Sequence, residues 1–345
     1  MSATPTPARP ATGARQRVVV ARRVFPDIVD RLRAHFDVLA NDGDAPWSRE
    51  QLQAALQDAQ GAFVTGTEPV DAALLAACPQ LRAVCSMAVG YNNIDVPACT
   101  ARGVMVTNAP GVLTETTADF GFALMMATAR RLGEAERFLR EGRWQHWGVE
   151  MFAGADVHGA TLGILGMGRI GQAIARRGHA GFGMRVVYHN RSRLPAGEDG
   201  ALGATWLPLD DLLATADHLV IVVPYSAATH HLVGAAQLAR MKPGATLTNI
   251  ARGGVVDDAA LAQALRTGPL GAAGLDVFEG EPAVHPGLLA APNAVLTPHI
   301  ASASVPTRRA MASLAVDNLL AALGVGPHAG HPPTLLNPDV RAARP

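Results

Sequence analysis

The sequence predicts an α/β protein of two domains, each built on a parallel sheet with helices on both faces. Three observations support this fold class. The chain has 345 residues, which is more than one average domain holds. Short apolar runs rich in valine alternate with segments whose apolar residues recur at helical spacing, the pattern of a parallel sheet. One of these runs, at residues 161–165, leads directly into a glycine-rich turn and a further helical segment.

The first series of elements occupies about the first hundred residues. We expect its strands at residues 17–21, 36–39, 61–65, 81–85 and 104–107, and its helices at residues 26–35, 48–56 and 70–77. Pro110 and Gly111 interrupt the series, and residues 114–131 follow as a long, mostly apolar helix. The sequence therefore predicts a domain boundary after residue 110.

The second series begins at residue 161 and is followed by one more helix. Its strands are expected at residues 161–165, 185–188, 218–223, 245–250, 272–277 and 294–296. Because six strands complete a dinucleotide domain, the helix at 305–323 is expected to return to the first domain. The predicted domains are residues 17–110 with 299–345, and residues 111–298. Residues 1–16 are rich in Pro, Thr and Ala without an apolar core, so we expect a disordered tail and no signal peptide.

Composition disfavours several classes of function. Lys and Arg together number 29, as do Asp and Glu, so the formal net charge is zero and no basic field for nucleic acid or an anionic membrane is expected. No apolar run approaches the length of a membrane span. The three cysteines, Cys78, Cys85 and Cys99, lack CxxC spacing, which disfavours a disulfide framework or a zinc site and is typical of a cytoplasmic protein. Motifs of P-loop enzymes, serine hydrolases and zinc proteases are absent.

The glycine-rich turn reads Gly-Met-Gly-Arg-Ile-Gly and spans residues 166–171. In a strand–turn–helix unit, Gly166 would allow the tight turn, Gly168 would let the backbone approach a pyrophosphate, and Gly171 would let helix and strand pack closely. The helix N-terminus would then face the phosphates. Glycine is common in this chain, 35 of 345 residues, so the flanking strand and helix carry much of the prediction that a dinucleotide binds here.

Three further groups stand at the ends of later strands. Arg252 follows the strand at 245–250, Glu281 follows the strand at 272–277, and His299 follows the strand at 294–296. Open α/β sheets bind ligands at this edge, and a guanidinium suits a carboxylate through two parallel hydrogen bonds. Each group taken alone has a structural interpretation as an ion pair, a solvated acid or a packed histidine. Together they could converge beside a nicotinamide.

These motifs, in this order, resemble the D-isomer-specific 2-hydroxyacid dehydrogenases. The resemblance rests on the glycine turn, Asn-x-x-Arg-Gly-x-x-Val-Asp at 249–257, Leu-Asp-Val-Phe-Glu-x-Glu-Pro at 275–282 and Pro-His at 298–299, and it extends over residues 17–338. Segments 89–95, 112–119 and 156–163 are most similar to bacterial glyoxylate/hydroxypyruvate reductases that also reduce 2-ketogluconate. The resemblance implies a Rossmann dinucleotide-binding domain and a discontinuous, flavodoxin-like α/β substrate domain.

The resemblance also implies an activity, the NAD(P)H-dependent reduction of small 2-keto acids to D-2-hydroxy acids. Arg252 would bind the substrate carboxylate and polarise the ketone, while His299 would donate a proton to the ketone oxygen as hydride arrives. Glu281 would pair with His299 and favour its imidazolium form. Backbone amides of Val89 and Gly90 would donate further hydrogen bonds to the substrate carboxylate. No metal is expected, because Arg252 and His299 would together stabilise the developing alkoxide.

The cofactor contacts follow from the same resemblance. Asp276 would contact the nicotinamide carboxamide. The other expected contacts are Gly166, Gly168, Arg169, Ile170, Gly171, Asn190, Arg191, Ser192, Thr117, Val223, Pro224, Thr229, Ile250 and Ala251. The strand at 185–188 runs into His-Asn-Arg-Ser-Arg at 189–193, where an NAD enzyme would usually carry an acid. Asn190 removes that negative charge, and Arg191, Ser192 and Arg193 offer partners to a 2′-phosphate. NADPH is therefore the expected cofactor, with NADH possible, unless these arginines are simply solvated.

Two departures from the family pattern concern substrate shape. Ala301 stands where the family commonly has glycine, and Asn92 stands where many relatives have Asp. Pocket width would depend on side chains such as Met87, Trp144, Trp147 and Met151, although the tryptophans could instead be interdomain core. Reduction of another 2-keto acid, such as phenylpyruvate or a phosphonate-like anion, is thus an alternative. A second alternative is a non-catalytic, dinucleotide-regulated binding protein of the corepressor type.

Quaternary structure is also implied by the resemblance. The helix at 114–131 and the segment at 134–147 are similar to the dimerisation region of the family, so a homodimer is expected. The alternative is that this helix belongs to the core of a single chain.

Overall fold

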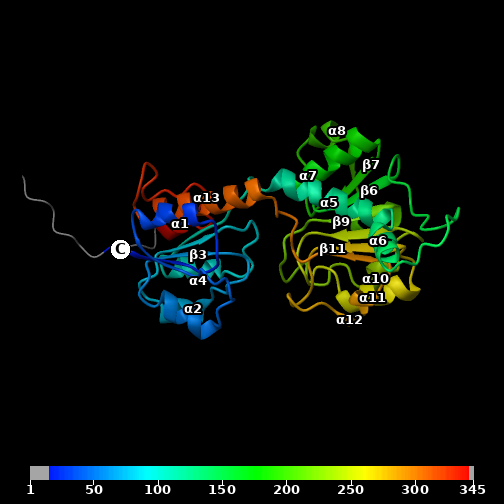
Figure 1. Cartoon of the computed structure of the whole chain (residues 1–345). Helices are drawn as coiled ribbons and strands as arrows, with labels where there is room; N and C mark the ends of the chain where they lie inside the picture. The colour runs from blue at the N-terminus through cyan, green and yellow to red at the C-terminus, as the bar shows by residue number, and fades with distance from the viewer. Residues whose placement is uncertain (1–14, 342–345) are drawn as a thin grey trace, which may run out of the picture. The chain divides into compact units, whose positions relative to one another are not determined.

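The computed structural model describes residues 15–341, and these form two compact units (Figure 1). Unit 1 contains the described residues up to Pro110 and those from Arg309 onward, and unit 2 is Gly111–Arg308. The predicted disordered tail, 1–16, lies outside the described residues except for its last two. Of these, Arg15 donates hydrogen bonds from its guanidinium to the carbonyls of Arg33 and Ala34, at 3.3 and 2.6 Å.

Unit 1 is built on a five-stranded parallel sheet in the order β2-β1-β3-β4-β5. This is the flavodoxin-like strand order that the resemblance implies. The strands are β1 (Arg17–Val20), β2 (Asp37–Ala40), β3 (Gly61–Val64), β4 (Ala83–Ser86) and β5 (Met105–Thr107). The helices are α1 (Pro26–Arg33), α2 (Arg49–Leu56), α3 (Ala72–Ala77) and α4 (Val96–Ala101), followed near the C-terminus by the 3₁₀ turn η2 (Pro338–Arg341).

Side-chain caps explain where several helices of unit 1 begin. Ser48 and Gln51 form a reciprocal capping box at the start of α2. Asp71 accepts a hydrogen bond from the Leu74 amide at the start of α3, and Asp95 does the same from Ala98 at the start of α4. Helix α4 was not predicted, although its aspartate cap is a recognisable start signal.

Unit 2 is built on a seven-stranded parallel sheet in the order β12-β11-β10-β9-β6-β7-β8. Numbered from β6, the six strands up to β11 follow the Rossmann order 3-2-1-4-5-6, and β12 extends that sheet. The strands are β6 (Thr161–Leu165), β7 (Arg185–His189), β8 (Ala204–Trp206), β9 (His218–Ile221), β10 (Thr246–Asn249), β11 (Ala272–Leu275) and β12 (Ala294–Leu296). Six strands were expected, and β8 was missed because this short edge strand has no run of apolar residues.

The helices of unit 2 surround this sheet. They are α5 (Thr114–Ala129), α6 (Leu132–Arg140), α7 (Arg169–Arg176), its π-helical continuation η1 (Arg177–Gly181), α8 (Glu198–Ala201), α9 (Leu209–Thr215), α10 (Ala235–Leu238), α11 (Asp258–Thr267) and α12 (Pro286–Leu289). Arg131 has a left-handed backbone with φ 55°, and it separates α5 from α6 where one helix to residue 131 was expected. In the described part of the chain, no helix has the length and apolar character needed to cross a bilayer.

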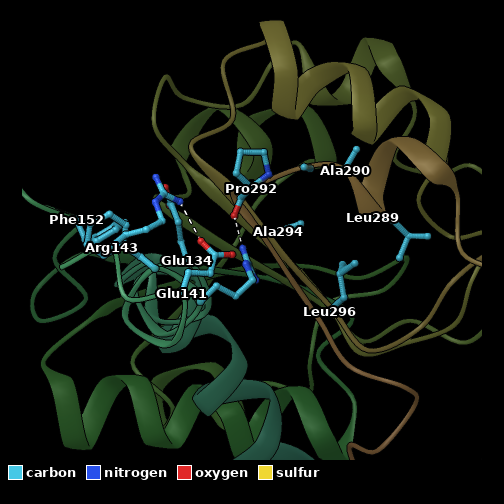
Figure 2. Close-up of a pocket in the computed structure, with 12 residues that line it drawn as sticks. Glu134, Glu141, Arg143, Phe152, Leu289, Ala290, Pro292, Ala294 and Leu296 are labelled. Carbon is cyan, nitrogen blue, oxygen red and sulfur yellow. Dashed lines mark hydrogen bonds and ion pairs between the residues drawn. The ribbon is translucent and has the colours of Figure 1, made fainter.

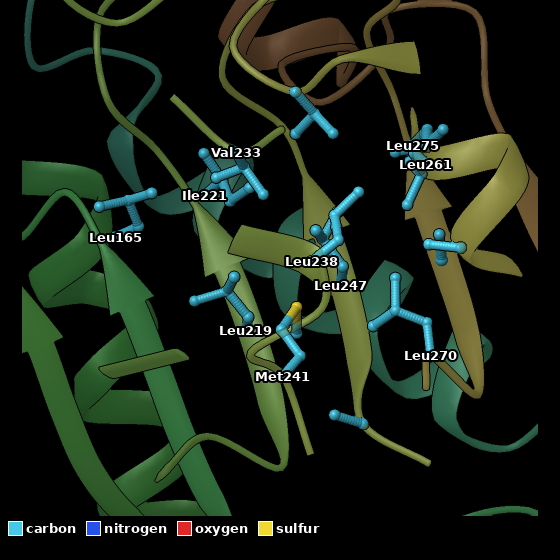
Figure 3. Packing of buried hydrophobic residues seen from close by; sticks show 14 of the residues in the cluster. Leu165, Leu219, Ile221, Val233, Leu238, Met241, Leu247, Leu261, Leu270 and Leu275 are labelled. Atoms are coloured by element: carbon cyan, nitrogen blue, oxygen red, sulfur yellow. The ribbon is translucent and has the colours of Figure 1, made fainter. Parts of the chain in front are cut away.

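Two hydrophobic clusters hold the sheet of unit 2. Figure 3 shows one of them, in which Leu219, Leu247 and Leu275 project from three neighbouring strands toward side chains such as Leu261 and Met241. The other cluster includes Ala118, Phe122 and Met125 of α5. Because the strands are buried on both faces, their carboxyl ends are fixed relative to one another.

The return of the chain to unit 1 comes later than the sequence suggests. The expected boundary was residue 299, whereas the units divide between Arg308 and Arg309, within α13 (Val305–Ala322). Residues 299–308 remain attached to unit 2 by side-chain contacts. Ile300 and Ala301 donate backbone hydrogen bonds to Asp276, each at 2.8 Å, and the Thr307 and Thr116 hydroxyls lie 2.6 Å apart.

Candidate active site

The glycine turn lies where β6 meets α7, beside the point at which the strand order reverses between β6 and β9. Gly166 has φ 105°, and a Cβ on it would lie 2.8 Å from the Val222 carbonyl. A Cβ on Gly171 would lie 2.2 Å from the Gly166 carbonyl oxygen, so helix and strand approach as predicted. A Cβ on Gly168 would meet no described atom within 4 Å, which leaves space for a phosphate beside the helix N-terminus.

Asn190 connects this turn to the end of β7. Its side-chain oxygen accepts a hydrogen bond from the Met167 amide at 2.7 Å, and the Gly166 amide donates to the His189 carbonyl at 3.0 Å. Arg191 and Ser192 follow with exposed side chains. The structure thus places the predicted ribose-binding segment directly against the predicted phosphate-binding turn.

Apart from Asp276, the remaining predicted cofactor residues lie on α5, at the start of α7, or after β9 and β10. Thr117 on α5 is buried, and its hydroxyl has no hydrogen-bond partner among the described residues. An unpartnered buried hydroxyl is costly, so this atom fits a contact with a bound group. Thr229 donates a hydrogen bond to the Pro224 carbonyl at 2.8 Å, which fixes the loop after β9. Val223, Ile250 and Ala251 stand just beyond the same strand ends, and Arg169 and Ile170 open α7.

Arg252 follows β10 and carries a half-buried guanidinium. Its Nη1 donates to the Ala251 carbonyl at 2.8 Å, and the Asn249 amide group donates to the Arg252 carbonyl at 3.2 Å. Burial lowers the pKa of Arg252, while the charge of Glu281 acts in the opposite direction. An arginine remains a cation after such a shift, so the site holds one positive group suited to a carboxylate.

Gly253, which follows Arg252, must be glycine because two loops pack closely at this position. A Cβ on Gly253 would lie 1.7 Å from the Phe278 carbonyl oxygen, so only glycine lets the loop after β10 approach the loop after β11. The Phe278 amide in turn donates to Glu281 Oε1 at 2.9 Å. This requirement for Gly253 has no local sequence signal, because the backbone that it meets is contributed by a distant part of the chain.

His299 and Glu281 form a hydrogen-bonded pair with 2.8 Å between His299 Nδ1 and Glu281 Oε2. The His299 side chain is 46% exposed, so its imidazole is accessible to a ligand. Burial favours a raised pKa for Glu281, but hydrogen bonds from His299 and the Phe278 amide, with the charges of His299 and Arg252, lower it overall. Glu281 is therefore ionised near neutral pH and can stabilise an imidazolium. The three predicted catalytic side chains are thus brought together at one sheet edge.

Asp276 holds the loop that carries His299. Its carboxylate is fully buried and accepts hydrogen bonds from the Thr297 hydroxyl and from the amides of Ile300 and Ala301, at 2.7, 2.8 and 2.8 Å. Burial raises the pKa of Asp276, although these hydrogen bonds oppose the shift. His299 has a left-handed backbone with φ 54°, and its amide donates to the Asp276 carbonyl at 2.9 Å. This anchoring role was not predicted, and the contact with a nicotinamide carboxamide remains a prediction.

Val89 and Gly90 belong to unit 1, where they follow β4. The Asn108 side chain donates to the Val89 carbonyl at 2.7 Å, which fixes the backbone of this segment. Their predicted contact with a substrate carboxylate remains a prediction. Trp144 and Trp147 are exposed, at 55% and 74%, so neither is buried within unit 2.

One cluster of metal-ligating side chains occurs among residues 15–341. It consists of His230, His231 and Glu279. His231 Nε2 lies 2.9 Å from Glu279 Oε2, and the two imidazole rings stack with centroids 3.9 Å apart. The cluster is separate from the His299–Glu281 pair, and the predicted chemistry draws on no metal.

A pocket of another kind lies beside α6. Figure 2 shows that Glu134, Phe152, Pro292 and Leu296 are among the side chains around it. Arg137 donates to the Pro292 carbonyl at 2.9 Å across this pocket. The three predicted catalytic residues are not among those that line it.

Comparisons with known proteins agree with this geometry. Residues 122–301 match the family model of the D-isomer-specific 2-hydroxyacid dehydrogenase NAD-binding domain. The chain is 46% identical over 332 residues to a glyoxylate reductase of Thermococcus onnurineus, covering 95% of this chain and 98% of that protein. It is 46% identical over 308 residues to glyoxylate/hydroxypyruvate reductase B of Serratia proteamaculans, covering 89% and 94%. An NADPH-dependent glyoxylate/hydroxypyruvate reductase from Sinorhizobium meliloti, solved with NADP and malonate, is 38% identical with a TM-score of 0.81, covering 95% of this chain and 98% of that one.

Proposed function

Because the chain belongs to the D-isomer-specific 2-hydroxyacid dehydrogenase family, we propose that it reduces small 2-keto acids, glyoxylate and hydroxypyruvate first among them, with NADPH. The observation that carries this proposal is the His299–Glu281 pair at 2.8 Å, within the electrostatic reach of the half-buried Arg252. A nicotinamide dinucleotide, when bound, supplies the hydride. The glycine turn, the open space at Gly168 and the unpartnered Thr117 hydroxyl fit that group.

The side chains divide the chemistry between binding and proton transfer. Arg252 binds the substrate carboxylate through parallel N–H donors and polarises the neighbouring ketone. Glu281 occupies Nδ1 of His299, so Nε2 is the nitrogen from which the proton reaches the ketone oxygen. In the oxidative direction, neutral His299 accepts the hydroxyl proton at the same nitrogen. Asp276 keeps the imidazole in position through the loop that it anchors.

The assay is the oxidation of NADPH in the presence of a panel of 2-keto acids. We expect turnover with glyoxylate and hydroxypyruvate. A larger kcat/KM with phenylpyruvate or another bulky 2-keto acid would replace the substrate assignment, but not the reaction class. Retained dinucleotide binding without turnover of any 2-keto acid would instead favour a dinucleotide-regulated binding protein.

The preference for NADPH is proposed from residues 190–193. Asn190 contributes no negative charge at the end of β7, and Arg191 and Arg193 lie within the next three positions. A relative of known structure is NADPH-dependent, as noted above. Comparison of kcat/KM for NADPH and NADH tests the proposal, and equal or better use of NADH would contradict it.

A homodimer is proposed from the surface of α6 and the segment after it. No residue of α6 is buried within the described chain. Its apolar side chains Leu132 and Leu139 are therefore left in water, at 56% and 57% exposure. Trp147 and Val149 beyond it are 74% and 82% exposed. A second copy of this chain would remove these apolar side chains from water. Light scattering tests the proposal, and a monomer mass would contradict it.

A cytoplasmic location is proposed from the cysteines. Cys78, Cys85 and Cys99 are all buried free thiols. Burial raises the pKa of Cys85 and of Cys99 to about 12, so these thiols are poor nucleophiles and suit a reducing compartment. Cell fractionation tests this location.

A further inference from the structure

Arg193 and Trp206 form a cation–π pair between the loop after β7 and the edge strand β8. The centre of the Arg193 guanidinium lies 4.6 Å from the centroid of the Trp206 ring. Trp206 is the last residue of β8 and pairs in register with Tyr188 of β7. Its ring is half-buried against the hydrophobic cluster that contains Tyr188, so the platform beneath Arg193 is held by the core.

Trp206 also fixes the other end of the same segment. Its indole Nε1 donates to the Asn190 carbonyl at 3.1 Å, and the Asn190 side chain accepts from Met167 in the glycine turn. Segment 190–193 is thus tied to one indole at both its first and its last residue. The sequence pattern alone could not show this arrangement, because β8 was not predicted.

A cation–π contact uses none of the hydrogen-bond donors of a guanidinium. An arginine over an aromatic ring is attracted electrostatically through the ring face, so its N–H groups can still donate to a ligand. Such a group binds a phosphate through parallel hydrogen bonds and loses less side-chain entropy on binding, because it is already ordered. The segment lies just past the second strand of the Rossmann sheet, where the ribose 2′ position of a dinucleotide is recognised.

We propose that Trp206 is a positioning residue that determines cofactor specificity, because it holds Arg193 and the Asn190 backbone ready for the 2′-phosphate of NADPH. This inference rests on the proposed use of NADPH. The 2′-phosphate is absent from NADH. Loss of the platform therefore weakens NADPH binding selectively, and NADH serves as an internal control.

The experiment measures kcat/KM and calorimetric Kd for both dinucleotides. The variants are Trp206→Leu, Trp206→Phe, Arg193→Ala and the double variant Trp206→Leu/Arg193→Ala. Arg193→Ala removes a charge-assisted contact and is expected to weaken NADPH binding about 10-fold or more. Trp206→Leu removes an exposed cation–π contact and is expected to weaken it about 2- to 5-fold. Trp206→Phe keeps a stacking face without the indole donor, so it is expected to recover part of that loss.

The NADPH-binding losses of the two single variants, compared with that of the double variant, show whether Trp206 acts through Arg193. The double variant is expected to resemble Arg193→Ala, because the platform has no value without its guanidinium. Phe25→Leu is the matched control, since it removes a similar platform under Arg309 in unit 1, at 4.8 Å, and should leave both dinucleotides unaffected. Thermal unfolding shows whether each variant is folded.

Two results would overturn the inference. One is an equal loss of NADPH and NADH affinity in folded Trp206→Leu, and the other is full additivity in the double variant. Failure of the proposed function gives a different result, because the wild-type protein would then lack turnover while the Kd values still test Trp206. A wild-type Kd that does not favour NADPH would contradict both the proposed cofactor and this inference.

Discussion

Replacing Glu281 by Gln is a sharp test of the proposal that Glu281 assists His299 as the proton donor. The substitution keeps the size of the side chain and removes the negative charge that lies 2.8 Å from His299. Two unit charges about 4 Å apart attract by about 1 kcal/mol in water and about 4 kcal/mol near a protein surface. The side chains of Glu281 and His299 are 31% and 46% exposed, so solvent screening reduces the attraction between them to about 1 kcal/mol.

The consequence is slower proton transfer from His299 to the ketone oxygen. A loss of about 1 kcal/mol corresponds to a fall of about 5-fold in kcat/KM for reduction, since 1.36 kcal/mol is a factor of ten. Burial acts to raise the pKa of Glu281, but the pairing with His299 and the charge of Arg252 lower it overall, so in the wild type this contribution is present near neutral pH and is lost only as pH falls through that lowered pKa. Glu281→Gln has no carboxylate to titrate, so its activity should lack this acidic step.

The measurement is kcat/KM against pH in both directions for the wild type and Glu281→Gln. Glu279→Gln is the matched control, because Glu279 contacts His231 at 2.9 Å and not His299. Its profile is expected to match the wild type. A wild-type kcat/KM in folded Glu281→Gln, or an equal loss in Glu279→Gln, would refute the assignment of Glu281 as the partner of the proton donor.

Three further predictions concern binding. Arg252→Lys retains the charge but loses the planar pair of donors, so kcat/KM for glyoxylate is expected to fall about 10- to 100-fold in steady-state assays, and a wild-type value would exclude carboxylate binding by Arg252. Gly168→Ala is expected to fold normally but raise the KM for NADPH. In Gly171→Ala the new Cβ would lie 2.2 Å from the Gly166 oxygen, so this variant is expected to lower the unfolding temperature as well. A lower unfolding temperature for Gly168→Ala than for Gly171→Ala would contradict this distinction. Thr117→Val removes a buried hydroxyl that lacks a partner among the described residues, so the stability of the free protein should be unchanged or improved. Dinucleotide binding measured by calorimetry should weaken, and unchanged binding would argue against a contact at Thr117.

Short-range patterns accounted for much of the fold and for the grouping of the three proposed catalytic side chains at one sheet edge. The glycine turn is local, and its three glycines have the steric environments that their spacing predicts. Arg252, Glu281 and His299 were predicted to meet because the carboxyl ends of parallel strands share one sheet edge. The Rossmann order of unit 2 and the flavodoxin-like order of unit 1 agree with the predicted fold class.

The features that sequence analysis missed depend on contacts between distant segments. Strand β8 is short and lies at a sheet edge, so its pattern carries little hydrophobic signal. Asp276 accepts hydrogen bonds from residues about twenty positions later in the chain, and Gly253 faces Phe278 across two loops. The later return to unit 1 has the same origin, since the loop after His299 is held by Asp276.

Proton donation by His299 during reduction of a 2-keto acid can be measured by comparing wild type with His299→Gln in NADPH oxidation by glyoxylate and hydroxypyruvate, with NADPH binding followed in parallel by calorimetry. We expect turnover by the wild type, a loss of about 100-fold or more in kcat for His299→Gln, and similar NADPH affinity in both proteins. A wild-type protein that binds NADPH without turnover, or a His299→Gln variant with wild-type kcat, would contradict this expectation.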